Sequence, residues 1–197
     1  MSRIDYSSLT DEKLIKIVQN GDDTAFNEIV NRYRDKLLNY INGFMNEIAV
    51  SENLVQDTLL KAYTNADKYQ EIAKFSTWIY TIAKNCALTE YRKIKRRKTF
   101  SFSQLSSKDN EFTLERIQGE ENQDLSSDTA TYNAIRGAIS KLPGEFREII
   151  ILKDIQEHSY DEISSITSLA LGTVKSRINR GRKKLKEIIE QDRRNDK

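Results

Sequence analysis

The sequence predicts an all-α fold: two small helical domains joined by a flexible acidic linker. Apolar residues recur at spacings of three and four through residues 10–98 and 131–190, which is the periodicity of amphipathic helices. The 197 residues include one proline and seven glycines, so tight turns are rare. Between the two periodic stretches, residues 99–130 are rich in Ser, Asp, Glu, Asn and Gln, which is typical of a linker.

Composition argues against several other classes of protein. The single cysteine, Cys86, cannot form an internal disulfide and fits a reducing compartment. No apolar run approaches the roughly 20 residues that a membrane-spanning helix needs, and no signal peptide opens the chain. We therefore expect a cytoplasmic protein without membrane insertion.

The first two helices are predicted from breaks and apolar stripes. Thr10 reads as the cap of a first helix, and Gly21-Asp22-Asp23 breaks that helix and starts the next. The second helix has an apolar stripe with the i, i+3/i+4, i+7 spacing of a buried helix face: Phe26, Ile29, Val30, Tyr33, Leu37 and Ile41. We expect its other face to be solvated: Asn27, Glu28, Arg32, Arg34 and Asp35.

A third helix is predicted after Ser51, which we take as its cap. The residues expected to face the core are Leu54, Val55, Thr58, Leu59 and Ala62. The other face of this helix is then expected to point away from the core, and it carries Gln56, Asp57, Leu60 and Lys61. An exposed leucine beside polar groups suits either a protein-binding face or an ordinary wet surface, and the residues alone leave both open.

A fourth helix is predicted from Phe75-Ser76-Thr77-Trp78 to about Arg97, after a short connection at residues 70–75. One face carries Phe75, Trp78, Ile79, Ile82 and Cys86, and a neighbouring stripe carries Thr81, Asn85, Leu88 and Arg92. Trp78 is expected in the core rather than as a platform for a base. The basic run at residues 92–98 suits phosphate binding, although it also complements the helix dipole.

The second domain is predicted to end in a helix-turn-helix. Helical segments are expected from about Thr131 to Pro143 and from Phe146 to about Ile155. Ser159-Tyr160-Asp161-Glu162 has the form of a capping box. After a turn near Ser168, a helix from about Gly172 has one apolar stripe: Val174, Ile178, Gly181, Leu185 and Ile188.

The outer face of that last helix is the strongest functional feature. It gathers Lys175, Ser176, Asn179, Arg180 and Lys183. Arg and Lys can donate to guanine, Asn can pair with adenine, and further basic residues neutralise phosphates. The face is therefore interpreted as a DNA-reading surface in the major groove, weighed against a plain basic surface helix.

Charge supports more than one contact with nucleic acid. Residues 71–99 carry 8 basic and 2 acidic side chains, and residues 175–197 carry 10 and 4. Residues 100–130 carry 2 basic and 7 acidic side chains. Two basic surfaces separated by an acidic strip suggest two contacts.

These blocks, taken in order, resemble the extracytoplasmic-function sigma factors of the sigma-70 family. The resemblance rests on FNEIVNRYRDKL, ENLVQDTLLKAY and FSTWIYTIAKNCALTEYRK, followed after a linker by LPGEFREIIILKDIQEHSYDEIS and GTVKSRINRGRKKL. It covers nearly all of residues 10–190. It implies a transcription initiation factor that binds bacterial core RNA polymerase and promoter DNA, is sequestered by an anti-sigma factor, and has no catalytic residue, cofactor or metal of its own.

The resemblance also implies roles for domains and residues. Residues 10–98 would bind polymerase and recognise and melt the −10 element, residues 99–130 would thread into the core enzyme, and residues 131–190 would read the −35 element. The polymerase-binding positions are Leu54, Gln56, Asp57, Leu60 and Lys61. The −10 positions are Phe75, Ser76, Thr81, Asn85, Arg92, Lys95 and Arg96. The −35 positions are Thr173, Lys175, Ser176, Asn179, Arg180 and Lys183, with Arg177 and Arg182 as packing or phosphate contacts.

The sequence departs from the family pattern at several of these places. Ser168 stands where the helix-turn-helix often has Gly, and Ala170 where a proline is usual. Asn179 replaces an aromatic residue of many members, and Gln70-Glu71 replaces the usual Arg-Gly pair of the loop that captures a flipped base. The promoter sequence therefore cannot be copied from a relative.

Two other classes compete with this interpretation. A DNA-binding regulator that acts without polymerase would need specific operator affinity of its own, usually in a two-fold arrangement. An enzyme is disfavoured, because the only histidine, His158, has no second His or Cys for a metal site and no Gly-rich phosphate loop is present. His158 itself is interpreted as a surface residue beside the capping serine.

Overall fold

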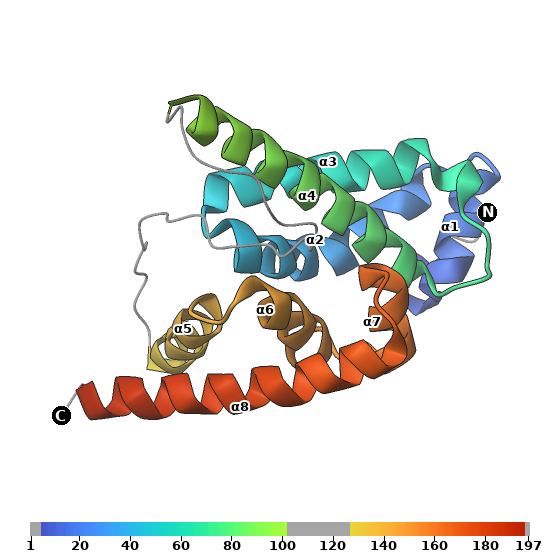
Figure 1. Ribbon diagram of the computed structural model, residues 1–197. Coiled ribbons are helices and arrows are strands. Elements are labelled where there is room, and N and C mark those ends of the chain that lie inside the picture. Colours follow the sequence, from blue (N-terminus) through green and yellow to red (C-terminus); the bar gives the residue numbers. More distant parts are fainter. Residues whose placement is uncertain (1–4, 102–126, 196–197) are drawn as a thin grey trace.

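The computed structural model describes residues 5–101 and 127–195, and within these ranges it contains helices and no strand, so the all-α prediction is confirmed (Figure 1). The N-terminal unit, residues 5–101, contains η1 (Tyr6–Ser8), α1 (Asp11–Gln19), α2 (Thr24–Met45), α3 (Ile48–Thr64), η2 (Ala66–Lys68) and α4 (Phe75–Ser101). The C-terminal unit, residues 127–195, contains α5 (Ser127–Ser140), α6 (Gly144–Ile150), the π-helical η3 (Ile151–Ile155), α7 (Tyr160–Thr167) and α8 (Leu171–Asn195).

The predicted linker, residues 99–130, lies mostly outside the described residues. Both of its ends are helical, since α4 continues to Ser101 and α5 already begins at Ser127. None of the described helices is long and apolar enough to cross a bilayer.

Several helix ends follow the predicted local chemistry. The Thr10 hydroxyl accepts a hydrogen bond from the Lys13 amide at 3.4 Å at the start of α1. At α7, the Glu162 amide donates to the Ser159 hydroxyl at 3.2 Å, and the Ser159 amide donates to the Glu162 carboxylate at 2.7 Å. This reciprocal pair satisfies two amides that a helix start otherwise leaves unpaired, and it confirms the capping box.

The predicted cap of the third helix was wrong. α3 begins at Ile48, so Ser51 lies inside it, fully buried, with its hydroxyl donating to the Glu47 carbonyl at 2.8 Å. Asn46 ends α2 in the left-handed conformation, with φ of 51°. The chain therefore turns within two residues, and the next helix can start earlier than a serine-based boundary suggests.

The core of the N-terminal unit forms where α2, α3 and α4 pack together. The stripe predicted on α2 is buried at Phe26, Ile29, Tyr33, Leu37 and Ile41, whereas Val30 is half-buried. The same helix also buries Tyr40, Phe44 and Met45 at its C-terminal end. Burying a large apolar side chain contributes about 1.5–3 kcal/mol, so this one helix supplies a large part of the stabilisation.

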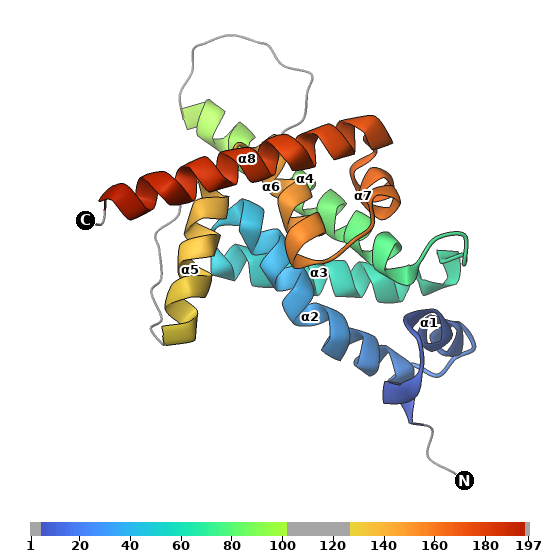
Figure 2. The same ribbon diagram turned by 90° about the horizontal axis from the view of Figure 1, so that it is seen from below.

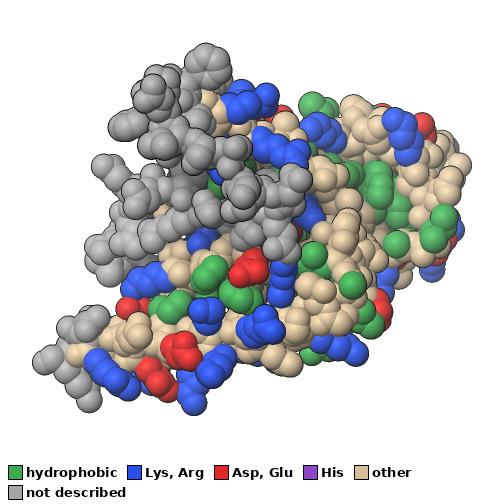
Figure 3. Space-filling model, in the orientation of Figure 1, with side chains coloured by type: hydrophobic (Ala, Val, Ile, Leu, Met, Phe, Trp, Pro, Cys, Tyr) green, Lys and Arg blue, Asp and Glu red, His purple; other side chains and the backbone are tan. Residues whose placement is uncertain are grey.

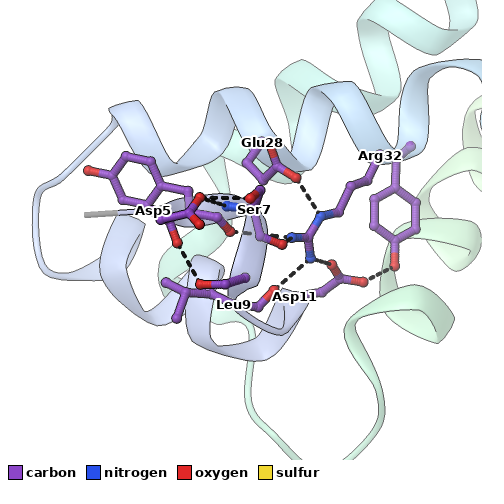
Figure 4. A network of polar contacts seen from close by, with 9 residues as sticks. Asp5, Ser7, Leu9, Asp11, Glu28 and Arg32 are labelled. Atoms are coloured by element: carbon purple, nitrogen blue, oxygen red, sulfur yellow. Dashed lines mark hydrogen bonds and ion pairs between the residues drawn. The ribbon is translucent and has the colours of Figure 1, made fainter. Parts of the chain in front are cut away.

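An arginine predicted to be solvated instead anchors the N-terminal segment to α2 (Figure 4). Arg32 donates to the carbonyls of Ser7 and Leu9, both at 2.8 Å. It also pairs with Asp11 and, one helical turn back, with Glu28, again at 2.8 Å in each case. A guanidinium group has five donors in a fixed fork, which lets one side chain hold three separate parts of the chain.

The C-terminal unit packs α5, α6 and α7 against the long helix α8. Val174 and Ile178 of α8 are fully buried, together with Ile163 of α7 and Ile150 of α6. Gly181 allows the closest approach, because an added Cβ would lie 2.9 Å from Ile150 Cγ1 and 3.2 Å from Phe146 Cβ. The predicted apolar stripe on α8 is thus the face that the helix buries.

The two units pack directly on each other. α7 lies beside the first half of α4, and α6 lies against α2 (Figures 1 and 2). Buried side chains of both units form one continuous hydrophobic cluster, which includes Tyr40 and Tyr80 from the first unit and Ile151 and Ile166 from the second.

The close approach at Gly181 generates a stability prediction. We expect Gly181→Ala to destabilise the protein by up to about 2 kcal/mol, because overpacking costs about 1–3 kcal/mol and the better helix propensity of Ala returns only about 1 kcal/mol. Gly137, in α5, is the matched control: an added Cβ there meets no atom within 4 Å. Gly137→Ala should stabilise the protein by about 0.5–1 kcal/mol. Thermal unfolding measures both, and a Gly181→Ala protein that melts above the parent would contradict the packing argument.

Candidate nucleic-acid interface

The exposed face of α8 is the first candidate surface. Lys175, Asn179, Arg180 and Lys183 are exposed, as predicted for a face that reads DNA. The other two predicted positions, Thr173 and Ser176, are half-buried, and the Ser176 hydroxyl donates to the Thr173 carbonyl at 3.0 Å. Blue side chains are visible along this helix in Figure 3.

The turn before α8 fixes how that face is presented. Ser168 ends α7 in the left-handed conformation, with φ of 59°. A serine therefore makes the turn that family members often make with glycine, at a modest conformational cost. The Ser164 hydroxyl donates to the Leu169 carbonyl at 2.6 Å and so ties the turn back to α7.

Two arginines of α8 pair with acidic groups of their own unit. Arg182 Nε donates to Asp154 at 3.1 Å, and a second guanidinium nitrogen of Arg182 also contacts that carboxylate. Arg177 lies 3.7 Å from the Glu145 carboxylate and is half-buried. These contacts fix the orientation of α8 relative to η3 and α6.

The second candidate surface is on α4. Asn85, Arg92, Lys95 and Arg96 are exposed, and Ser76 and Thr81 are half-buried. The structure does not place Phe75 on this surface. Phe75 is 0% exposed and packs edge-on against Tyr33 and Tyr69, with ring centroids 5.5 and 5.6 Å away. Trp78 is half-buried and packs against Tyr69 and Phe75, so it lies at the edge of the core.

The third candidate surface is on α3. Gln56, Asp57, Leu60 and Lys61 are exposed, and Leu60 is 60% exposed, which is high for a leucine. Leu54 differs from the other predicted contacts because it is only 5% exposed. Leu54 therefore belongs to the core beneath this surface rather than to the surface itself.

His158 is not the surface residue that we predicted. Its side chain is 5% exposed, its ring packs edge-on against Tyr80 of α4 at 4.6 Å, and its Nε2 has no hydrogen-bond partner. Burial lowers the pKa of His158, and the nearby Glu162 carboxylate partly opposes this. Sequence reasoning missed this burial because the ring that covers His158 is 78 residues away in the chain.

Cations of the N-terminal unit contact both ends of α7. Lys74 Nζ lies 2.9 Å from the Glu162 carboxylate at the start of α7. Lys84 Nζ donates to the carbonyls of Ile166 and Thr167 at its end, at 3.2 and 2.8 Å. Burial would raise the pKa of Glu162, but hydrogen bonds from Lys74 and Ser159 outweigh it and lower that pKa to about 2.

A partly buried carboxyl group lies where α6 meets α2. Tyr40, on α2, donates its hydroxyl to Glu148 at 3.2 Å. Burial raises the pKa of Glu148, although the positive charge of Lys84 opposes the shift. Lys74, Lys84, Tyr40 and Glu148 were absent from the sequence-based set of functional residues, and no local pattern distinguishes them from ordinary helix positions.

The part of the chain that the structure describes gathers no group of three or more His, Cys, Asp or Glu side chains able to hold a metal ion. The described parts of α4 and α8 each expose a basic and polar face. Such faces suit binding to phosphates and base edges.

Comparison with known families matches both units. Residues 29–97 match Sigma-70 region 2, and residues 132–185 match Sigma-70, region 4. The first segment includes α3 and most of α4, and the second includes α6, α7 and the exposed face of α8.

Curated relatives match over almost their whole length. The chain is 34% identical over 180 residues to the extracytoplasmic-function RNA polymerase sigma factor SigW of Bacillus subtilis, covering 90% of this chain and 96% of the relative. It is 32% identical over 185 residues to the sigma-E factor of Escherichia coli K12, covering 92% and 95%.

Two solved structures are similar in fold. CnrH, in complex with the cytosolic domain of CnrY, superposes with a TM-score of 0.66 at 22% identity, covering 92% of this chain and 98% of CnrH. The sigma factor RpoE of Bartonella quintana, in complex with the anti-sigma factor NepR, gives a TM-score of 0.65 at 26% identity, covering 84% and 96%.

The burial of His158 generates a pH prediction. Because burial lowers its pKa, we expect the imidazole to titrate below its ordinary value of 6.5. A group with a depressed pKa of this kind stabilises the folded state fully above about pH 6.5, and that contribution is lost as the pH falls through the folded pKa. His158 is the only histidine, so its ring resonances in NMR are unambiguous. A titration midpoint at or above 6.5 would contradict its burial against Tyr80.

Proposed function

The chain belongs to the extracytoplasmic-function sigma factors of the sigma-70 family, and from that premise we propose how its surfaces divide the work of promoter recognition. The protein is a transcription initiation factor that acts with RNA polymerase at specific promoters. The observation that carries this function is the presence of both sigma-70 regions, in order, in a chain that spans 96% of a relative at 34% identity.

We assign recognition of the −35 element to α8. Lys175, Asn179 and Arg180 are exposed on α8, which follows the capped helix α7 and the left-handed turn at Ser168. Such a helix fits the major groove, where Arg and Asn can each make two hydrogen bonds to one base. Thr173, Ser176 and Lys183 complete the proposed face, with Lys183 as a phosphate contact.

We assign recognition and melting of the −10 element to α4 and the loop before it. Thr81 and Asn85 offer hydrogen-bond donors and acceptors, and the exposed Arg92, Lys95 and Arg96 can hold the DNA backbone. Unstacking a base costs a few kcal/mol, which contacts to the captured base can offset. Ser76 belongs to this surface, whereas the role left for Phe75 is to support it from the core.

We assign binding of the polymerase core to the face of α3. An apolar residue that is 60% exposed, Leu60, stands beside exposed Gln56, Asp57 and Lys61. A central apolar anchor within a polar rim is the usual composition of a protein interface. Leu54 would position this face from beneath.

The remaining assignments concern partners and chemistry. We propose that the chain makes no covalent bond itself, that it works in the cytoplasm beside polymerase, and that an anti-sigma factor sequesters it. The last point is supported by the RpoE relative, which was solved in complex with an anti-sigma factor. A free-standing DNA-binding regulator is the alternative, and it would require tight specific binding without polymerase.

The first experiment tests the α3 face. We expect Asp57→Ala with Leu60→Ala to weaken binding to core polymerase at least about tenfold, equivalent to about 1.4 kcal/mol, and to abolish strand opening at a promoter taken from upstream of its own gene. The matched control is Asp35→Ala with Ile135→Ala, an exposed acid and a 44%-exposed aliphatic residue outside α3. If the parent protein binds a discrete DNA site tightly and core adds nothing, the free-standing regulator is the correct class.

A second experiment separates base reading from phosphate binding on α8. Asn179→Ala should weaken the binding free energy for promoter DNA by about 1–3 kcal/mol and relax the sequence preference at one base pair. Lys183→Ala should weaken binding to all sequences alike and reduce the slope of log affinity against log salt by about 1. Lys68→Ala, an exposed lysine on η2, is the control with no expected effect. Holoenzyme binding across a salt series measures all three.

A further inference from the structure

The connection between α3 and α4, residues 65–74, is a largely exposed segment with its own set of contacts. It contains η2 and then a turn in which the Ile72 amide donates to the Gln70 carbonyl at 2.7 Å. The Tyr69 hydroxyl donates across this turn to the Ala73 carbonyl at 2.8 Å. Ile72 is 88% exposed, so the turn presents an aliphatic side chain to solvent.

One side of α1 contacts this connection. Gln19 Nε2 donates to the carbonyls of Ala66 and Tyr69, at 2.8 and 3.0 Å. One helical turn earlier, Lys16 forms an ion pair with Glu71. Side chains of α1 therefore bind the connection both at η2 and in the turn that follows it.

A third side chain of α1, Glu12, supports the start of α4. Its carboxylate accepts a hydrogen bond from the Phe75 amide at 3.1 Å. The first amides of a helix have no partner within the helix, and a negative charge near them is favourable because of the helix dipole. Glu12, Lys16 and Gln19 are four and three residues apart, so they follow one another along one side of α1.

α1 is in turn fixed on α2. Asp11 accepts a hydrogen bond from Arg32 at 2.8 Å (Figure 4) and another from the Tyr33 hydroxyl at 2.5 Å. The ring of Tyr33 also packs edge-on against Phe75, with the centroids 5.5 Å apart. Asp11 and Glu12 are neighbours in the chain, so α1 links α2 to the first residue of α4.

We propose that α1 is a positioning element for promoter opening: Glu12, Lys16 and Gln19 hold the connection, with its exposed Ile72, in the conformation that engages the −10 element. This inference rests on the −10 role proposed above for α4 and the loop before it. A connection that is already ordered loses less conformational entropy when it binds melted DNA. The three positioning residues precede residues 29–97, the segment that matches Sigma-70 region 2.

The contacts of α1 with the connection contribute little to the stability of the whole unit. The side chains of Lys16 and Glu71 are 56% and 53% exposed, and exposed ion pairs add little to the free energy of unfolding. Gln19 is also exposed, and it binds carbonyls of the connection. Substitutions here should therefore change the order of the connection and promoter opening more than the melting temperature.

Gln19→Met tests the two hydrogen bonds, because methionine is of similar length and has no donor. Hydrogen exchange of the backbone amides in residues 66–75 should become faster, while exchange in α2 and α3 stays unchanged. Opening of the promoter by holoenzyme, followed with a fluorescent base in the −10 element, should fall about fivefold, as expected for the loss of about one net hydrogen bond. Binding to core polymerase should not change. Gln191→Met, at an exposed glutamine of α8, is the matched control.

A charge reversal tests the ion pair. Lys16→Glu should reduce promoter opening about threefold, and adding Glu71→Lys should restore it, because the pair is rebuilt with its charges exchanged. Lys13→Glu is the matched control, since Lys13 is exposed on α1 and lies roughly 100° around the helix from Glu12. Lys13→Glu should open the promoter normally, but Lys13→Glu with Glu71→Lys should be defective, because Lys16 then faces a second lysine. The two double variants have the same net charge, so the difference between them measures the contact with α1.

Each outcome has a distinct meaning. Faster exchange in the connection without a loss of promoter opening overturns the positioning role. Unchanged exchange in Gln19→Met, or equal opening by the two double variants, overturns the claim that α1 holds the connection. Asn85→Ala, which keeps the α1 contacts, tests the proposed function separately: normal opening by this variant overturns the −10 role of α4, and this inference with it. Faster exchange with a fivefold loss of opening, neither of which Gln191→Met reproduces, supports the proposal.

Discussion

The structure depends on α2 being buried on more than one side. The stripe from Phe26 to Ile41 forms the core of the N-terminal unit with α3 and α4, as an ordinary amphipathic helix would. Its C-terminal half continues the burial with Tyr40, Phe44 and Met45 and contacts α5, α6 and η3. A helix that is apolar over a wide arc must be covered from several directions, because exposed apolar surface is costly in water. α2 therefore holds the N-terminal and C-terminal units together.

One residue links a local device to this long-range packing. Glu162 completes the capping box of α7 and also forms an ion pair with Lys74 of the other unit. The start of α7 is thus coupled to the loop that precedes α4. His158 lies beside the same carboxylate and packs on Tyr80, so its titration reports on the same boundary.

The boundary between the two units combines apolar packing with polar contacts at α7. Lys74 and Lys84 of the first unit are satisfied by carboxylate and carbonyl oxygens at the two ends of α7. These contacts hold α7 against the first half of α4.

The sequence by itself determined most of the helices and the exposed face of α8. The all-α class, the capping box at Ser159, the left-handed turn at Ser168 and the exposed side chains of α8 follow from interactions within a few residues of the chain, and periodicity reports these directly. The start of α3 was misplaced because Ser51 is a good cap only where the backbone needs one, and the turn at Asn46 had already met that need.

Tertiary structure decided which of these residues are covered and by what. Arg32 was assigned to solvent and His158 to the surface, yet both make contacts with residues brought together only by folding. The family resemblance assigned Phe75 and Leu54 to binding faces, but both are buried, as the apolar spacing of their helices indicated. The packing of α7 on α4 and of η3 on Gly43 joins positions about 80–110 residues apart, and periodicity along one helix carries no information on which distant helix will cover it.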